Sequence, residues 1–313
     1  MILQQQEINN YLQDYHNGKI SMGKGIGCKD FDDNLRYKQG ELTIINGLDN
    51  VGKTDFMIWY ALALSMKHNI KWCIYSGENK GGQLVRKLIQ YLTGEKVLEM
   101  KFSEVTRAEL KIQQWFTFID NSNFYKLEDL LKIFKDGDFN ACLIDPFTGL
   151  DRGFTHSDNY NFLNTCRNFC ETTNINIFVN THVVTEAARR KYGDNQAFPG
   201  YPFPPSKSDS EGGQAFGNRP DGFLTIHRLV GHPSMNTKTM LYIRKVKDTE
   251  TGSKVSSIEN PVLLDFNNGL GFVINGENPL TQVIASEKIQ APIEPNNQFD
   301  SLDKSNKWDI SPF

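Results

Sequence analysis

Short apolar runs alternate with longer amphipathic stretches through the first two thirds of the chain. Five apolar runs predict strands, at 42–46, 70–75, 115–119, 139–144 and 175–180. Four stretches between them predict helices, at 53–68, 82–92, 127–134 and 159–171. Strands that are apolar throughout and separated by helices are typical of a parallel sheet buried on both faces. The sequence therefore predicts an α/β fold with a mostly parallel central sheet flanked by helices.

The pattern changes in the C-terminal third. Four short strands separated by turn residues are predicted at 223–227, 239–245, 262–266 and 271–274. Their spacing indicates antiparallel strands added at one edge of the sheet. Residues 279–313 are polar and rich in Pro and Asn, which predicts a largely disordered tail. The main domain is therefore expected to span 23–278.

An N-terminal arm, residues 1–22, precedes a glycine-rich joint. Its apolar residues fall roughly on one helical face, and they are Ile2, Leu3, Ile8, Tyr11, Leu12 and Tyr15. This spacing predicts a short helix. The helix either caps its own domain or docks on a neighbouring subunit, and the sequence leaves both roles open.

Composition excludes several classes of protein. No apolar run approaches the ~20 residues needed to cross a bilayer, and the first residues lack the pattern of a signal peptide. The five cysteines are odd in number and are not spaced as a disulfide or zinc framework, which indicates reduced, buried thiols in a cytoplasmic protein. The net charge of −3 excludes a broadly basic surface, so any contact with DNA must be local.

The strongest chemical signal is the segment from Gly47 to Thr54, Gly-Leu-Asp-Asn-Val-Gly-Lys-Thr. It matches the phosphate-loop pattern G-x-x-x-x-G-K-[ST] and lies between a predicted strand and a predicted helix. Lys53 is expected to reach the β- and γ-phosphates of a nucleotide, and Thr54 to bind Mg²⁺. Asp49 is unusual in an anion-binding loop, and its side chain is expected to point away from the phosphates. The remaining nucleotide-binding candidates in and beside the loop are Gly47, Asn50, Val51, Gly52 and Asp55.

Polar residues follow three of the predicted strands. Asp145 ends an apolar run and is the candidate Mg²⁺-binding acid, because ligands bind at the carboxyl ends of strands in such sheets. Glu78 follows the strand next to the phosphate loop and is the candidate base that orients the attacking water. His182 follows the strand at 175–180 and is the candidate sensor of the γ-phosphate.

Together these segments resemble the RecA-like ATPase domain of DnaB-like hexameric helicases, in particular the helicase domain of phage primase–helicases and of the related mitochondrial replicative helicase. The similar segments follow the order of the family over roughly residues 20–275. They are 40–47, 76–79 with 83–84, 144–147, 181–182, 212–215 running to 220–221, 226–228, and 245–247 followed by 251–252.

The resemblance implies a homohexameric DNA helicase that hydrolyses ATP or dTTP with Mg²⁺ at its subunit interfaces. In the family a lysine and, two residues later, an arginine finger reach into the nucleotide of the next subunit. This sequence has Lys245 and Lys247 there, and lysine lacks the planar fork of arginine. Three readings stay open: Lys247 serves less efficiently, Arg244 takes over, or turnover is slow. Arg228 is a further candidate near the nucleotide.

The resemblance also implies a DNA-contacting segment between His182 and Gly213. Its candidate residues carry positive charge or expose backbone N–H groups, which suits phosphate contact without sequence reading. They are Arg189, Arg190, Lys191, Lys207, Ser208, Gly212 and Gly213. The acidic, aromatic end at 307–313 is a candidate peptide for recruiting a primase, a polymerase or a single-strand-binding protein.

Two other functions remain open from the sequence. A RecA-like recombinase or recombination mediator would share the core but form filaments on DNA. A replication accessory protein would bind nucleotide as a structural ligand without acting as a motor. The lysine at position 247 keeps the second alternative open.

Overall fold

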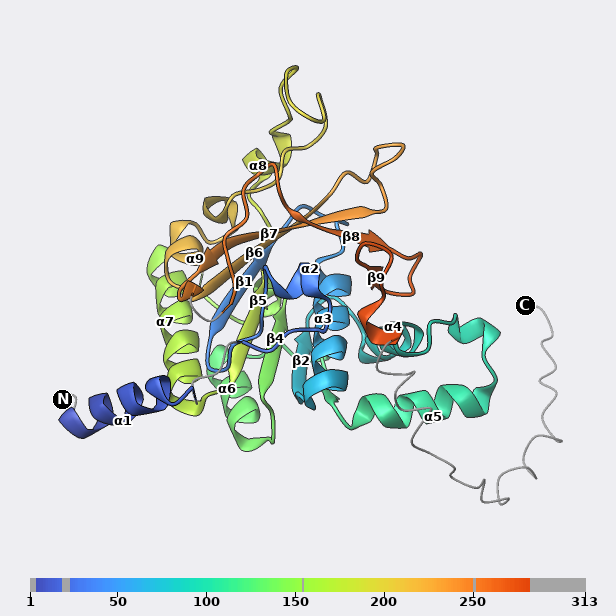
Figure 1. Ribbon diagram of the computed structural model, residues 1–313. Helices are drawn as coiled ribbons and strands as arrows, with labels where there is room; N and C mark the ends of the chain where they lie inside the picture. The colour runs from blue at the N-terminus through green and yellow to red at the C-terminus, as the bar shows by residue number, and fades with distance from the viewer. Residues whose placement is uncertain (1–3, 19–22, 154, 250–251, 282–313) are drawn as a thin grey trace.

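The computed structural model describes residues 4–18, 23–153, 155–249 and 252–281 (Figure 1). Within this part of the chain the strands form a single sheet in the order β3-β2-β4-β5-β1-β6-β7-β8-β9. The strands are β1 Leu42–Asn46, β2 Trp72–Ser76, β3 Phe116–Phe118, β4 Ala141–Asp145, β5 Asn176–Asn180, β6 Gly222–Arg228, β7 Lys238–Val246, β8 Val262–Phe266 and β9 Phe272–Val273. The mostly parallel sheet and its antiparallel edge are thus confirmed.

The prediction for the strand at 223–227 was wrong in one respect. This strand, β6, pairs in parallel with β1, and only β7, β8 and β9 are antiparallel. The reason is the long connection over 181–221, which returns the chain to the same end of the sheet before β6 begins. Such crossovers give parallel pairing, whereas the short turns that follow β6 give antiparallel pairing.

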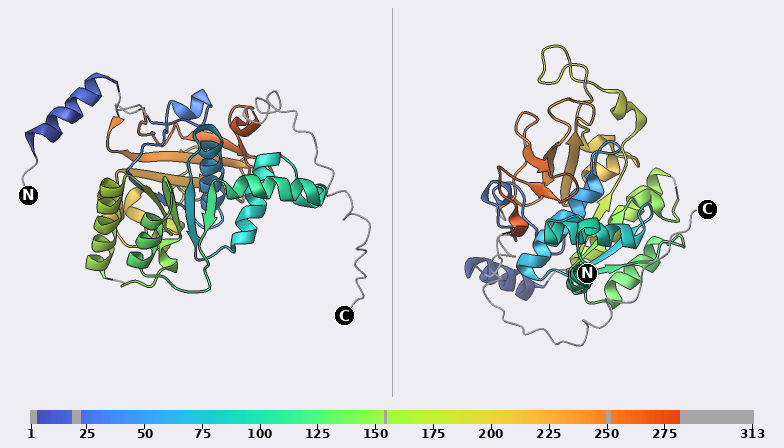
Figure 2. Two further views of the ribbon diagram at one scale, coloured as in Figure 1. Left: turned by 90° about the horizontal axis from the view of Figure 1, so that it is seen from below. Right: turned by 90° about the vertical axis from the view of Figure 1, so that its right-hand side faces the viewer.

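The longer helices cover both faces of the sheet (Figures 1 and 2). One hydrophobic cluster joins the sheet to α3, α4 and α5, and a second joins it to α6 and α7. Residues 56–65 of α3 are all buried, which explains why this helix is apolar on every side. These helices are α3 Lys53–His68, α4 Gly81–Thr93, α5 Phe102–Gln113, α6 Leu127–Asp136 and α7 His156–Thr173.

Shorter elements connect them. Helix α5 was not predicted, because only Ala108 and Ile112 of its residues are buried and the apolar pattern is therefore weak. The short helices and 3₁₀ turns are α2 Lys29–Asp32, η1 Val97–Glu99, η2 Phe147–Gly149, α8 Thr185–Arg189, η3 Lys207–Asp209 and α9 Gln214–Asn218. All five cysteines are free and buried.

The predicted arm helix is present as α1 Gln5–His16, and it projects away from the body (Figures 1 and 2). None of its residues is buried, and its apolar side chains are 36–58% exposed. At the other end, Leu280 is 1% exposed and belongs to the core, so the folded part continues past residue 278. The rest of the predicted tail, 282–313, lies outside the described residues. No helix of the described part is long and apolar enough to span a membrane.

Candidate nucleotide-binding site

A cavity of about 650 Å³ opens at the carboxyl ends of β1, β2, β4 and β5, around the start of α3. This is the edge of the sheet where the sequence places its polar strand ends. Its lining residues are Asp49, Asn50, Gly52, Lys53, Thr54, Asp55, Glu78, Asn79, Lys87, Asp145, Pro146, His182, Val183 and Arg228. The structure therefore brings together most of the nucleotide-site candidates of the sequence.

The phosphate loop takes a conformation that depends on its small residues. Gly52, which precedes α3, has φ +90°, and Asn50 has φ +60°, both in the left-handed region. A Cβ atom on Gly47 would lie 2.4 Å from the carbonyl oxygen of Ile226 on β6. The loop is thus fixed between β1 and β6, with the N-terminus of α3 facing the cavity, which is a geometry suited to anion binding.

Lys53 is held at the loop. Its Nζ donates to the carbonyl oxygens of Gly47 at 3.0 Å and Leu48 at 3.2 Å. Burial lowers the pKa of Lys53, while the nearby carboxylates oppose this shift. The ammonium group lacks a carboxylate partner at salt-bridge distance among the described residues, so it is available to an anionic ligand.

Asp145 ends β4 at the floor of the cavity and is 3% exposed. Its Oδ2 accepts from the hydroxyl of Thr54 at 2.8 Å, and its Oδ1 accepts from the amide of Asn180 at 2.6 Å. Burial raises the pKa of Asp145, and the two hydrogen bonds oppose that rise. Asn180 was missed by sequence reasoning, although it is a polar residue that ends an apolar strand, which is the signal that marked Asp145.

The hydroxyl of Thr54 and the carboxylate of Asp145 form a pair of oxygen groups beside the phosphate loop. Mg²⁺ prefers oxygen ligands and in phosphate-loop proteins takes few of them from the protein, the rest coming from phosphates and water. No group of three or more His, Cys, Asp or Glu side chains in the described residues could hold a metal alone. The residues present therefore fit an Mg²⁺ that is bound together with a nucleotide.

Glu78 and His182 both line the cavity and contact each other. The Nε2 atom of His182 lies 3.2 Å from Oε1 of Glu78, and its Nδ1 lies 3.5 Å from Oδ1 of Asp49. The side chain of Asp49 therefore extends from the phosphate loop toward His182. The expectation that it points away from bound phosphates stays a prediction. The base candidate and the sensor candidate are in direct contact.

A second cluster of side chains lies around Asp55, which also lines the cavity. Asp55 accepts from the hydroxyl of Tyr91 at 2.6 Å and pairs with Nζ of Lys87 at 2.9 Å. Sequence reasoning missed Lys87, which α4 brings to the cavity. Arg228, at the end of β6, donates to the carbonyl oxygen of Asn50 at 3.0 Å, and its guanidinium lies 5.1 Å from the ring centre of Phe266. Arg228 is thus beside the site, as predicted.

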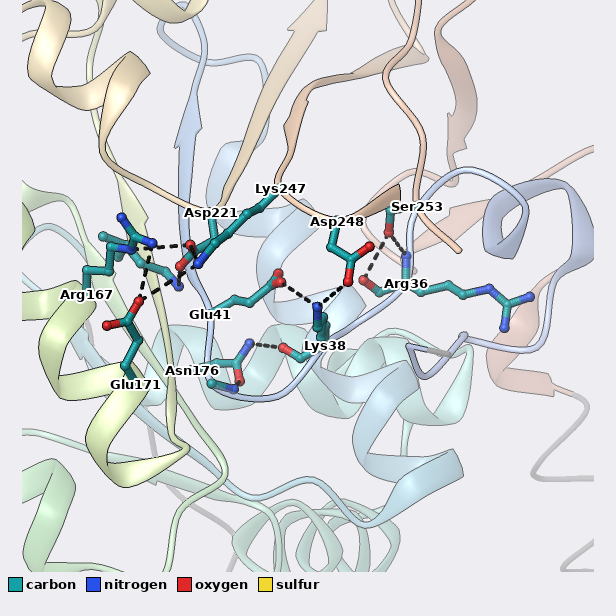
Figure 3. A network of polar contacts seen from close by, with 12 residues as sticks. Arg36, Lys38, Glu41, Arg167, Glu171, Asn176, Asp221, Lys247, Asp248 and Ser253 are labelled. Atoms are coloured by element: carbon teal, nitrogen blue, oxygen red, sulfur yellow. Dashed lines mark hydrogen bonds and ion pairs between the residues drawn. The ribbon is translucent and has the colours of Figure 1, made fainter. Parts of the chain in front are cut away.

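The other cationic candidates lie away from this cavity. In the β6–β7 register Arg228 pairs with Thr239 near the phosphate loop, whereas Phe223 pairs with Lys245 near the opposite end of β6. Lys247 pairs with Asp221 at 2.9 Å and approaches Glu171 at 3.8 Å (Figure 3).

Lys245 and Arg244 point in different directions. Lys245 donates to the carbonyl oxygen of Asn218 at 2.6 Å, near the Asp221 network. Arg244 donates to the carbonyl oxygen of Pro205 at 2.9 Å, and its guanidinium lies 4.5 Å from the ring centre of Tyr242. Burial lowers the pKa of Lys245, and the nearby Lys207 acts in the same direction.

The predicted DNA segment follows β5 and runs beside the cavity. Val183 and Ser210 form an antiparallel bridge, which ties the two ends of the segment together. Arg190 forms an ion pair with Asp209. The candidates Arg189, Arg190, Lys191, Lys207 and Ser208 are exposed, and Gly212 and Gly213 have left-handed backbone with φ +104° and +85°.

The sheet order and the phosphate loop define the class: the chain has the RecA-like fold of P-loop proteins. No protein-family model matches the sequence, and no curated protein matches it. Among solved structures, the ATPase domain of G40P aligns with a TM-score of 0.69 and 13% identity, over 86% of this chain and 97% of that one.

A structure of a DnaB-like replicative helicase and its interactions with primase aligns with a TM-score of 0.66 and 14% identity, over 88% of this chain and 67% of that one. At such low identity these likenesses show the fold alone. It is the fold of the ATPase domain of DnaB-like replicative helicases, as the sequence predicted.

Proposed function

We propose that the chain is a replicative DNA helicase that assembles into a ring, most simply a hexamer, and moves along single-stranded DNA by hydrolysing ATP or dTTP with Mg²⁺. One observation carries the proposal. Lys53, Thr54, Asp145 and Glu78 surround one cavity, whereas Lys245 on β7, with Lys247 just after that strand, lies near the opposite end of β6. The chain thus holds two halves of a site that a neighbouring copy would complete.

Each residue at the cavity has a role that its position supports. Lys53 binds the β- and γ-phosphates, and Thr54 and Asp145 hold Mg²⁺, which shields phosphate charge when bound. Glu78 accepts a proton from the attacking water. His182, 3.2 Å from Glu78, contacts the terminal phosphate and couples its loss to the segment that follows β5.

The cation supplied to the neighbouring subunit comes from Lys245 and Lys247. Both side chains extend toward the connection between α9 and β6, where they meet Asn218 and Asp221. Arg244 is a poorer candidate, because its guanidinium packs on Tyr242 and donates to Pro205. We therefore assign the role in trans to the two lysines.

DNA contact is assigned to the segment that contains Arg189, Lys207, Ser208, Gly212 and Gly213. Lys207 and Ser208 are exposed, and the left-handed backbone of Gly212 and Gly213 leaves room for close approach of a phosphate. Recruitment of a primase, polymerase or single-strand-binding protein through 307–313, and a cytoplasmic location, complete the proposal.

Steady-state hydrolysis with and without a single-stranded oligonucleotide tests the proposal. The wild type is expected to hydrolyse ATP faster when the oligonucleotide is present. Glu78→Gln should lose at least about 100-fold in rate while it still binds nucleotide. Rates that do not respond to the oligonucleotide, with normal nucleotide binding, would favour the accessory-protein alternative. Electron microscopy of open filaments instead of rings would favour the recombinase alternative.

A further inference from the structure

His182 lies between two carboxylates that come from different parts of the fold. Glu78 follows β2 and lies 3.2 Å from Nε2, and Asp49 belongs to the phosphate loop and lies 3.5 Å from Nδ1. The imidazole is the most enclosed of the three, with its side chain 28% exposed, against 55% for Glu78 and 83% for Asp49. Asp49, His182 and Glu78 thus form a row of contacting side chains that line the cavity.

The position of Asp49 is unexpected for an anion-binding loop. A carboxylate in this loop would repel a negatively charged ligand, and no hydrogen bond ties this side chain to the loop backbone among the described residues. The side chain instead extends to His182, whose Nδ1 lies 3.5 Å from its Oδ1. Each ring nitrogen of His182 thus faces a carboxylate, one from the phosphate loop and one from the residues that follow β2.

We propose that Asp49 is a positioning residue that competes with the terminal phosphate of the nucleotide for His182. This inference rests on the proposed function, in which His182 contacts that phosphate. Without a terminal phosphate, Asp49 and Glu78 together hold the imidazole. A triphosphate must draw His182 away from Asp49, and a diphosphate need not. Asp49 therefore sets how strongly the site prefers a triphosphate over a diphosphate.

The test compares binding of ADP with binding of a non-hydrolysable ATP analogue, both with Mg²⁺, by calorimetric titration. Asp49→Asn removes the charge at constant size and should raise the ratio of triphosphate to diphosphate affinity about threefold, as expected for loss of one exposed polar contact. Asp49→Glu keeps the charge and should retain the wild-type ratio. Asp136→Asn, at the exposed end of α6, is the charge-matched control and should also retain it.

A double-mutant cycle separates an effect through His182 from a direct effect of Asp49 on the phosphates. In a His182→Ala background, Asp49→Asn should no longer change the ratio. An unchanged ratio in the single variant, or an equal change in both backgrounds, would overturn this inference alone. Failure of the wild type to bind any triphosphate would overturn the proposed function and this inference with it.

Discussion

Replacing Asp145 with asparagine should stabilise the nucleotide-free protein while abolishing its hydrolysis. Burying a charged carboxylate costs several kcal/mol, and the hydrogen bonds from Thr54 and Asn180 offset about 1.5–3 kcal/mol each. Asparagine keeps both bonds, because its oxygen accepts from Asn180 and its amide donates to the Thr54 hydroxyl. We expect the free energy of unfolding at neutral pH to rise by about 1–2 kcal/mol and the melting temperature by roughly 2–6 °C.

The expected gain in the free energy of unfolding depends on pH. Burial raises the pKa of Asp145 in the folded state above its value in the unfolded chain. The stability that this group contributes is therefore complete below the unfolded pKa and is lost as the pH rises through the folded pKa. The advantage of Asp145→Asn over the wild type should be largest at neutral pH and should shrink on acidification.

Thermal and urea unfolding at several pH values measure this difference, and Asp136→Asn serves as a surface control expected to stay within about 0.5 kcal/mol of the wild type. Adding ATP and Mg²⁺ should stabilise the wild type by mass action and the Asp145 variant much less. If Asp145→Asn is equally or less stable than the wild type at neutral pH, the carboxylate is not destabilised by its burial and the reasoning fails.

Two further predictions concern Glu41 and Lys87. Burial raises the pKa of Glu41 to about 7, so its contribution to stability is complete below the ordinary pKa of glutamate and is lost as the pH rises through about 7. Glu41→Gln should therefore lose less stability than the wild type over this pH range, as measured by the urea midpoint of unfolding. An unchanged dependence of the midpoint on pH would contradict the raised pKa. Lys87 lines the cavity, and its Nζ lies 2.9 Å from Oδ1 of Asp55. Lys87→Met should therefore weaken nucleotide binding about two- to fivefold, with little change in the hydrolysis rate at saturating nucleotide. An unchanged affinity in calorimetric titration would place Lys87 outside the binding surface.

The phosphate loop and its acids could be predicted because their signals are local. Asp145, Glu78 and His182 each follow an apolar strand, and parallel strands bring their carboxyl ends to one edge of a sheet. The phosphate-loop pattern then identified the edge of the sheet at which the candidate nucleotide-binding site lies. Position along a strand was therefore enough to place these three side chains around one cavity.

Other features depend on contacts between distant segments. Lys87 reaches the cavity because α4 packs on α3, and no local pattern marks it among the 34 lysines and arginines. The direction of β6 depends on the whole connection over 181–221. The pairing of Lys247 with Asp221 and Glu171 joins three segments that are far apart in the sequence (Figure 3), so the contacts of the two lysines could not be predicted from their spacing.

The separation of the two half-sites leads to a prediction about assembly. Thr239 and Lys245 are six residues apart on β7, which corresponds to about 20 Å at ~3.3 Å per residue. A lysine side chain cannot cover that distance, so Lys245 and Lys247 cannot complete the cavity of their own chain. Hydrolysis should therefore require a second copy and should fall on dilution.

Mixing two inactive variants tests this directly. Lys53→Ala lacks a functional phosphate loop but keeps both lysines, and the double variant Lys245→Met with Lys247→Met has the reverse defect. In a random ring, about one quarter of the interfaces would combine an intact loop with intact lysines. Hydrolysis should therefore reappear on mixing, although neither variant is active alone. Mixed rings that form normally but remain inactive would mean that the lysines do not act across the interface, because each defect would then be confined to its own subunit.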